Sequence, residues 1–272
     1  MQSGSSYLLG VASTEHDRLV RQSALFHPVT HRLFREAGIG SGQRVLDVGS
    51  GVGDVTLLAA RLVGPSGAVV GVERDPKALA IAASRAAGAG LANVSFIQAE
   101  IEGVSAEQLF DAVVGRFILE YLPNAGEIVR SLAGLLQPGG VMAFQDASWG
   151  PWLRLSEGLP LLAKCVSLIV EAFARSGAHV DMELVFYRTF REAGLPAPTM
   201  RVEIPIGDDP NIVRYAHDLF FTLLPRMDEY GLSLSELGDL ETLKSRLEEE
   251  RVTANSFGSS VGLVSAWSRK PG

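Results

Sequence analysis

The segment Val45-Leu-Asp-Val-Gly-Ser-Gly-Val-Gly-Asp54 constrains the fold of this chain more than any other. A short strand-like segment with three Val or Leu residues at 44–48 leads into three alternating glycines, and a mostly apolar helical segment follows at 55–62. Glycine has no Cβ, so Gly49 and Gly51 permit a tight turn and a close approach of the backbone to a ligand. The N-terminus of the following helix offers unpaired N–H groups and a positive dipole end to an anionic group. The segment therefore predicts a strand, a glycine loop and a helix that bind a nucleotide-like cofactor.

Strand-like and helix-like patterns alternate through the first half of the chain. Strands of five to seven residues alternating with helices indicate parallel βαβ units and a doubly wound α/β sheet. The predicted strands are 44–48, 68–73, 94–98, 110–115 and 140–146, and the predicted helices between them are about 54–63, 76–88 and 124–136. Residues 14–38 also have a helical pattern, which Pro28 is predicted to divide into two helices.

The regular alternation stops near residue 150. Residues 152–194 and 210–250 look mainly helical, with a strand at about 199–206 between them and a β-like run at 262–268 to close the chain. We therefore expect three parts in one integrated domain. They are an N-terminal helical cap (1–40), a cofactor-binding core (41–150) and the last two strands with helical insertions that form a substrate lid (151–272).

Composition excludes several classes of partner. The 272 residues carry a net charge of −7, which argues against a broad phosphate-binding surface and hence against nucleic acid. The single cysteine, Cys165, excludes an internal disulfide or a thiolate metal cluster. No signal-peptide pattern and no apolar run of roughly 18 residues is visible. A cytoplasmic enzyme without membrane partners is expected, with a homodimer as one possible assembly.

The acidic residues around the glycines narrow the choice of cofactor. The dinucleotide fingerprint G-x-G-x-x-G/A needs a small residue where this chain has Asp54, and Asp47 precedes Gly49 by two positions. Carboxylates disfavour a pyrophosphate and suit a cofactor with sulfonium and amino groups. The spacing D-x-G-x-G-x-G, with Glu73 closing the second predicted strand, resembles the first motifs of class I S-adenosylmethionine-dependent methyltransferases.

This resemblance implies a fold and a set of binding residues. The fold is a Rossmann-like, seven-stranded, mostly parallel sheet, whose last strand lies antiparallel between the fifth and sixth. In that family the glycine loop surrounds the amino-acid part of the cofactor, the acid ending the second strand binds the ribose, and an acid with an apolar neighbour after the third strand binds the adenine. The corresponding positions here are Asp47, Gly49, Ser50 and Gly51 for the loop, Glu73 for the ribose with Arg74 next to it in the cofactor site, and Glu100 and Ile101 for the adenine.

Arg116 and Phe117 follow the fourth predicted strand and complete the predicted cofactor site. A guanidinium just past a buried strand needs a partner, because an unpaired buried charge is costly. Glu120 on the following turn and a carboxylate of the cofactor are equally good candidates for that partner.

The N-terminal segment has a narrower resemblance. Tyr7, Arg18 and Gln22 fit a pattern in a bacterial and fungal subgroup of small-molecule methyltransferases, in which this helix packs over the cofactor site. Arg18 and Gln22 lie four residues apart and share a helix face, and Tyr7 is a candidate aromatic partner for the sulfonium. An ordinary solvated helix surface is the alternative for Arg18 and Gln22, and a role in ordering the terminus is the alternative for Tyr7.

The acceptor side is the least constrained. Asp146, after the fifth strand, is the first candidate for a catalytic base, and a packed loop carboxylate is the alternative. His27 and His31 lie four apart without an HExxH pattern, so we expect half-buried helix histidines and no metal site. His179 and His217 in the insertions are further candidates to face substrate.

The sequence favours one function over two others. It predicts a methyltransferase that acts on a small, fairly apolar metabolite at O, N or C. The alternatives are a cofactor-binding member that does not transfer methyl groups, either a rearrangement enzyme or a regulator, and an NAD(P)-dependent oxidoreductase.

Overall fold

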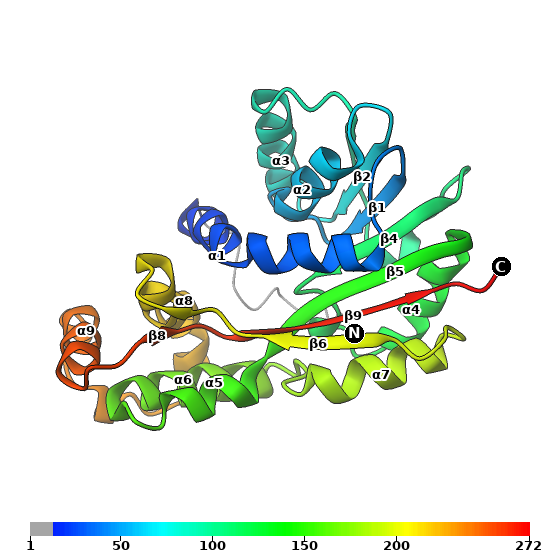
Figure 1. Ribbon diagram of the computed structural model, residues 1–272. Coiled ribbons are helices and arrows are strands. Elements are labelled where there is room, and N and C mark those ends of the chain that lie inside the picture. The colour runs from blue at the N-terminus through cyan, green and yellow to red at the C-terminus, as the bar shows by residue number, and fades with distance from the viewer. Residues whose placement is uncertain (1–12) are drawn as a thin grey trace. The chain divides into compact units, whose positions relative to one another are not determined.

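The computed structural model describes the backbone of residues 13–272 and the side chains from Gln22 onward. The chain divides into two compact units (Figure 1). The core unit comprises residues 26–146, 182–202 and 263–272. The helical unit comprises residues 147–181 and 203–262 together with the chain up to Leu25.

This division does not follow the predicted part boundaries at residues 40 and 150. The N-terminal helix belongs to the helical unit up to Leu25 and to the core unit from Phe26. Segments 182–202 and 263–272 return to the core unit, because they supply the last two strands of the sheet and a helix that packs on it.

A seven-stranded sheet in the order β3-β2-β1-β4-β5-β9-β6 forms the centre of the core unit. β1 pairs in parallel with β2 and β4, and parallel pairing continues from β2 to β3 and from β4 to β5. The predicted doubly wound α/β fold is confirmed. The strands are β1 Arg44–Val48, β2 Ala68–Glu73, β3 Val94–Gln98, β4 Phe110–Arg116, β5 Leu136–Ser148, β6 Thr199–Glu203 and β9 Gly262–Arg269.

The last strand, β9, runs antiparallel to β5. Gly139 N donates to Lys270 O at 3.0 Å, and Lys270 N donates to Gly140 O at 2.8 Å, which pairs the start of β5 with the end of β9. Farther along, Gln145 Nε2 donates to Ser265 Oγ at 2.8 Å. The predicted insertion of the last strand between the fifth and sixth is therefore confirmed.

Helices cover both faces of the sheet (Figure 1). Because side chains alternate along a strand, each strand sends one set of residues to each face. Val45, Val69, Ala112, Val114, Val141 and Ala143 pack with the second half of α1 and with α2 on what we call the α2 face. Leu46, Val48, Val70, Val72, Val113, Met142 and Phe144 pack with α4 and α7 on the α4 face. The core-unit helices are α2 Asp54–Val63, α3 Pro76–Gly88, η1 Ile101–Gly103, η2 Leu119–Tyr121, α4 Ala125–Gly134 and α7 Met182–Glu192.

The N-terminal helix α1, Ser13–Ala37, continues through Pro28, so the prediction of two separate helices is wrong. Proline inside a helix costs about 3 kcal/mol, mainly through a lost hydrogen bond and a steric clash. Here Pro28 and Ala24, whose carbonyl loses the helical donor, are both exposed to water. Phe26 and Leu33 on the opposite side are buried, and burial of two such side chains, at about 1.5–3 kcal/mol each, offsets the cost.

The helical unit is built around buried aromatic side chains. Trp149 packs on Phe173 with ring centroids 4.4 Å apart, and Trp152 packs on Tyr215 at 5.4 Å. Within residues 13–272, no helix is both long and apolar enough to span a membrane. The elements are α5 Trp149–Ser156, α6 Pro160–Arg175, β7 Ile206–Gly207, α8 Pro210–Glu229, η3 Ser235–Leu237, α9 Leu243–Thr253 and β8 Gly258–Ser259.

Candidate cofactor-binding site

The glycine loop, residues 49–53, lies at the switch point of the sheet, where ligands bind in open α/β folds. All three of its glycines have positive φ angles. A Cβ on Gly49 would lie 1.9 Å from Ile118 Cδ1, and one on Gly53 would lie 2.9 Å from Leu57 Cδ1. At Gly51 (φ 52°), no heavy atom of the described residues beyond Gly51 and its two chain neighbours lies within 4 Å of that position. The loop is therefore packed at both ends and open at Gly51, where a ligand can approach.

Glu73 closes β2 directly beside this loop. Its Oε2 accepts from Gly51 N at 3.0 Å, and its Oε1 accepts from Arg74 N at 2.9 Å and Asp75 N at 3.0 Å. The carboxylate is half-buried, so it keeps lone pairs for a ligand while three backbone N–H groups fix its orientation. Glu73 therefore lies beside the loop, at the position for which the resemblance implies a ribose contact.

Asp47 lies on the α2 face of β1, under the loop, and is 1% exposed. Its Oδ2 accepts from Thr56 Oγ1 of α2 at 2.5 Å. Within the described residues, its Oδ1 and the buried Ser50 Oγ have no hydrogen-bond partner. Burial raises the pKa of Asp47 to about 7, although the Thr56 hydrogen bond and the charge of Arg116 act in the opposite direction.

This raised pKa predicts a pH-dependent stability. Asp47 holds its proton more tightly in the folded chain than in the unfolded chain, so its contribution to stability is full below about pH 4 and is lost as the pH rises through 7. We expect Asp47→Asn to remove this part of the pH dependence. Urea unfolding of both proteins between pH 5 and 8 measures it, and parallel curves for wild type and variant over that range would contradict the assignment.

Asp54, the first residue of α2, does not present a free charge to the site. Its Oδ1 pairs with Arg85 Nη2 of α3 at 2.5 Å, and its side chain is 10% exposed. The prediction that Asp54 contributes to an acid-rich loop therefore needs correction, because Arg85 offsets its charge. Asp47 and Glu73 remain as the acids beside the loop.

Arg116 ends β4 on the α2 face, next to Thr30 of α1. Its Nη1 donates to Thr30 Oγ1 at 3.0 Å, and the Thr30 hydroxyl is 2.7 Å from Gln145 Oε1 on β5. The Thr30 hydroxyl has one proton, which it donates to Gln145 Oε1. Its oxygen therefore accepts the hydrogen bond from the Arg116 guanidinium. Phe117, the next residue, has a φ of 58°, a strained value for a non-glycine residue that is typical of functional sites.

The Thr30 hydroxyl is expected to hold this chain of hydrogen bonds together. Thr30→Val keeps the shape but leaves Gln145 Oε1 without its buried donor, so we expect a loss of about 1–3 kcal/mol in the free energy of unfolding. Thr30→Ser, which keeps the hydroxyl, is the matched control. Equal urea midpoints for the two variants would show that these hydrogen bonds do not contribute to the free energy of unfolding.

The predicted adenine residues follow β3. Glu100 is exposed and lies 3.9 Å from Arg74, a distance typical of a weak surface ion pair. Ile101 begins η1 and is half-buried, with one side against the core. Both residues are therefore available to a ligand that extends from Glu73 past the end of β3.

Asp146 lies on the other face of β5 from Gln145 and is fully buried. Its Oδ1 accepts from Ile118 N at 2.7 Å, and Ile118 is the side chain that packs on Gly49. Burial and the neighbouring Glu120 raise its pKa well above the ordinary range. Asp146 is thus a packed carboxylate inside β5, hydrogen-bonded to the backbone next to the loop.

The structure describes only some of the remaining candidate residues. Tyr7 and the side chain of Arg18 lie outside the described residues. His27 and His31 are half-buried on α1, as expected, with ring centroids 6.3 Å apart. Cys165 is fully buried on α6.

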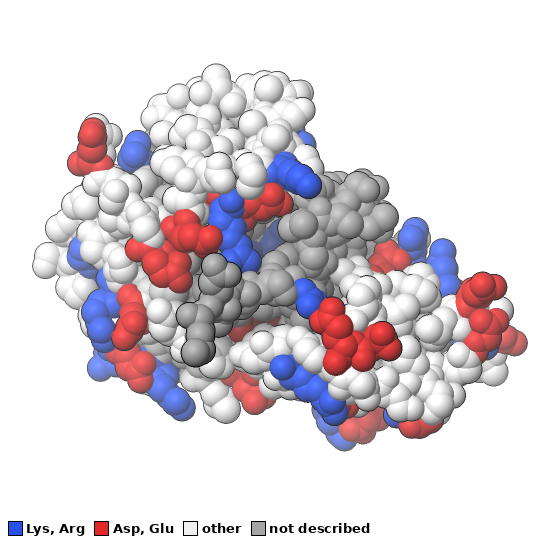
Figure 2. All heavy atoms as spheres, turned by 180° about the vertical axis from the view of Figure 1, so that it is seen from behind, with Lys and Arg blue, Asp and Glu red and all other residues white. Residues whose placement is uncertain are grey.

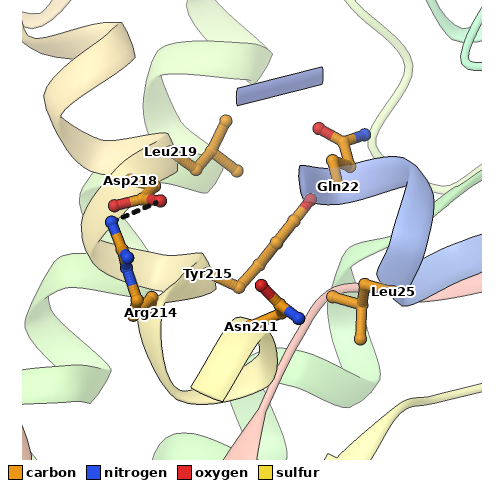
Figure 3. Close-up of a pocket in the computed structure, with 7 residues that line it drawn as sticks. All are labelled: Gln22, Leu25, Asn211, Arg214, Tyr215, Asp218 and Leu219. Atoms are coloured by element: carbon orange, nitrogen blue, oxygen red, sulfur yellow. Dashed lines mark ion pairs between the residues drawn. The ribbon is translucent and has the colours of Figure 1, made fainter. Parts of the chain in front are cut away.

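Gln22 lines a hollow in the helical unit (Figure 3). The hollow also contains Leu25 of α1 and residues from the first half of α8. There Arg214 and Asp218 form an ion pair at 3.6 Å. Asp218 Oδ1 also lies 3.1 Å from Nδ1 of His217, which does not line the hollow. The other lining residues are Asn211, Tyr215 and Leu219.

The fold and the loop geometry define an α/β protein with a binding site for a nucleotide-like cofactor, and comparison with known proteins gives its family. The family model described as "Methyltransferase domain" matches residues 39–194, more than half of the 272-residue chain. The chain therefore belongs to the methyltransferase-domain family. The predicted class I S-adenosylmethionine-dependent methyltransferase fold is confirmed, and with it S-adenosylmethionine as the cofactor of the family.

Curated relatives share the cofactor-binding region. The chain is 34% identical over 158 residues to the ubiquinone/menaquinone biosynthesis C-methyltransferase UbiE of Pseudomonas paraeruginosa, covering 53% of this chain and 62% of that protein. It is 36% identical over 125 residues to UbiE of Pseudomonas putida, covering 43% and 49%. The chain thus spans less than two thirds of the length of these relatives.

Solved structures share the fold at low identity. The YcgJ protein of Bacillus subtilis is 17% identical, with a TM-score of 0.57 over 90% of this chain and 99% of that one. The [4+2]-cyclase SpnF is 16% identical, with a TM-score of 0.51 over 90% and 81%. Proteins with different reactions share this fold, so the fold by itself does not identify the reaction.

Proposed function

We propose that this chain transfers a methyl group from S-adenosylmethionine to a small-molecule acceptor. One observation carries the proposal. In a chain of the methyltransferase-domain family, the open residue of the glycine loop, Gly51, is held by the carboxylate that ends β2, Glu73. The buried Asp47 and Ser50 oxygens without partners among the described residues mark the same place as polar.

We assign binding roles to the residues around the loop. Gly51 lets the backbone approach the cofactor closely, and Glu73 accepts hydrogen bonds from the ribose hydroxyls. Glu100 and Ile101 contact the adenine, with Arg74 beside Glu100. Thr30, whose hydroxyl donates to Gln145, orients Arg116, whose guanidinium can serve either Glu120 or a carboxylate of the cofactor.

The chemistry asks little of the chain beyond positioning. Bound S-adenosylmethionine supplies a methyl group activated by its positive sulfur. The residues of the site then hold the reacting atoms in line and exclude water, which accounts for most of the acceleration in such displacements. We propose that Asp146 acts by holding Ile118 against Gly49, since its buried carboxylate accepts backbone N–H groups, and not as a base.

The acceptor is proposed as a class only. The relatives named as C-methyltransferases support a small molecule, while O, N and C remain open as the acceptor atom. Acidic and basic residues are mixed among the described residues on the face shown in Figure 2.

Transfer of a labelled methyl group tests the reaction. The purified chain is incubated with methyl-labelled S-adenosylmethionine and a metabolite extract, and mass spectrometry identifies any labelled product. A labelled small molecule formed only with active protein supports the proposal and names the acceptor. Absence of label across extracts, in a protein that binds the cofactor, would favour a member of the family that does not transfer methyl groups.

A further inference from the structure

We propose that Arg85 is a positioning residue that holds the glycine loop in its cofactor-binding conformation. The inference rests on the proposed function, because it assigns a role in cofactor binding to a residue outside the predicted site. We call Arg85, the Val52 carbonyl and the Asp54 carboxylate the Arg85 latch.

Two short hydrogen bonds make up the latch. Arg85 Nη1 donates to Val52 O at 2.6 Å, and Arg85 Nη2 donates to Asp54 Oδ1 at 2.5 Å. The two acceptors flank Gly53, whose φ of 89° makes it the turn between loop and helix. One planar guanidinium therefore fixes both sides of the loop's last turn, a geometry that lysine cannot reproduce with a single ammonium.

The latch supplies a second anchor to a loop that is intrinsically mobile. Glycine loses more conformational freedom on ordering than any other residue, and this loop contains three glycines in five residues. Glu73 holds Gly51 from β2, and Arg85 holds Val52 and Asp54 from α3. A loop ordered before binding costs the cofactor less conformational entropy, so its affinity is higher.

The ion pair between Arg85 and Asp54 is largely shielded from solvent, so it contributes to the conformation of the loop. The Asp54 side chain is 10% exposed and the Arg85 side chain 29% exposed, and hydrogen bonds between charged groups are about twice as strong as neutral ones. Without Arg85, the Asp54 charge would lie unpaired at the start of α2, and the Val52 carbonyl would lose its side-chain donor.

We expect Arg85→Ala to weaken binding of S-adenosylhomocysteine by about tenfold, from lost preorganisation of the loop. Arg85→Lys keeps the charge and one contact, so an intermediate loss of about threefold is expected. Arg154→Ala, which removes an exposed arginine from α5 in the helical unit, is the control for the change in net charge.

The experiment combines calorimetric binding of S-adenosylhomocysteine with hydrogen exchange of peptide 49–56 in the cofactor-free full chain. The latch predicts faster exchange of this peptide in Arg85→Ala than in wild type, together with weaker binding, while Arg154→Ala matches wild type in both. Equal exchange and equal affinity in Arg85→Ala would overturn the latch and leave the proposed function intact.

Two further outcomes keep the two proposals separate. If wild type itself fails to bind S-adenosylhomocysteine, the proposed function fails, and exchange in the cofactor-free chain still decides on the latch. If Arg85→Ala does not fold, Asp54→Asn replaces it, because that variant weakens the ion pair while the Val52 contact remains. Unchanged exchange in Asp54→Asn would then overturn the latch.

Discussion

Gly49→Ala is expected to abolish cofactor binding and to lower the free energy of unfolding by about 2–5 kcal/mol. Two effects add. A φ of 67° costs an L-residue about 1–2 kcal/mol, and a Cβ at 1.9 Å from Ile118 Cδ1 requires a shift of a buried neighbour, at about 1–3 kcal/mol. Ile118 cannot move freely, because its amide is held by the buried Asp146 carboxylate. Urea unfolding and calorimetric titration with S-adenosylhomocysteine measure the two losses.

Two glycine variants separate strain from steric overlap. Gly139→Ala, in the irregular first part of β5, has a φ of 77° and no described atom beyond its chain neighbours within 4 Å of its Cβ, so it should show strain alone, about 1–2 kcal/mol. Gly51→Ala should show a similar cost, but with loss of cofactor affinity, because its Cβ enters the open side of the loop. If Gly49→Ala is no more destabilising than Gly139→Ala, the close packing of the loop on Ile118 is wrong.

Glu73→Ala is expected to weaken binding of S-adenosylhomocysteine by about 10- to 100-fold. Hydrogen bonds to a charged group contribute about 1.5–3 kcal/mol, which corresponds to that range in Kd. The variant removes the acceptor for Gly51 N as well as the proposed ribose contact, so both the loop and the ligand lose a partner. Calorimetric titration at one pH and ionic strength gives the ratio of affinities.

The matched variants for Glu73 are Glu73→Gln and Glu102→Ala. Glutamine has a side chain of the same length and keeps one oxygen acceptor, so Glu73→Gln should retain part of the affinity for S-adenosylhomocysteine. Glu102 is an exposed acid in η1, and its loss changes the net charge equally without touching the loop. Unchanged affinity in Glu73→Ala would show that the ribose assignment is wrong, whatever the effect on stability.

The regular elements were predictable because each follows from a local pattern. The first three strands, together with α2 and α3, begin and end at the predicted residues, since periodic apolar runs and glycine or proline boundaries mark them. The position of Glu73 beside Gly51 was also predictable, because parallel strands present their carboxyl ends at one edge of the sheet.

The partners of the site residues were not predictable from local patterns. Arg85 lies 31 residues from Asp54, and Thr30 lies 86 residues from Arg116, so only the tertiary fold brings each pair together. Nothing in the sequence around Arg85 or Thr30 marks either residue as part of the site. The face on which Asp146 lies was predictable, because side chains alternate along β5 and Asp146 must therefore lie on the opposite face from Gln145.

Pro28 shows how tertiary packing can override a local rule. Proline predicts a helix boundary, yet α1 continues through it, because burial of the apolar side chains on both sides offsets the lost hydrogen bond. Asp54 shows that the charge of a site also cannot be predicted from the local sequence alone. A carboxylate in a glycine loop suggests an acidic site, until a distant arginine offsets it.

The central claim is that the loop around Gly51 binds S-adenosylmethionine, and thermal unfolding with and without ligands tests it most directly. A ligand at 100 times its Kd stabilises the folded chain by about 2.7 kcal/mol, enough to raise Tm by several degrees. We expect S-adenosylmethionine and S-adenosylhomocysteine each to raise Tm in wild type but not in Gly49→Ala, and NAD to leave it unchanged. A rise with NAD and none with S-adenosylmethionine or S-adenosylhomocysteine would contradict the account.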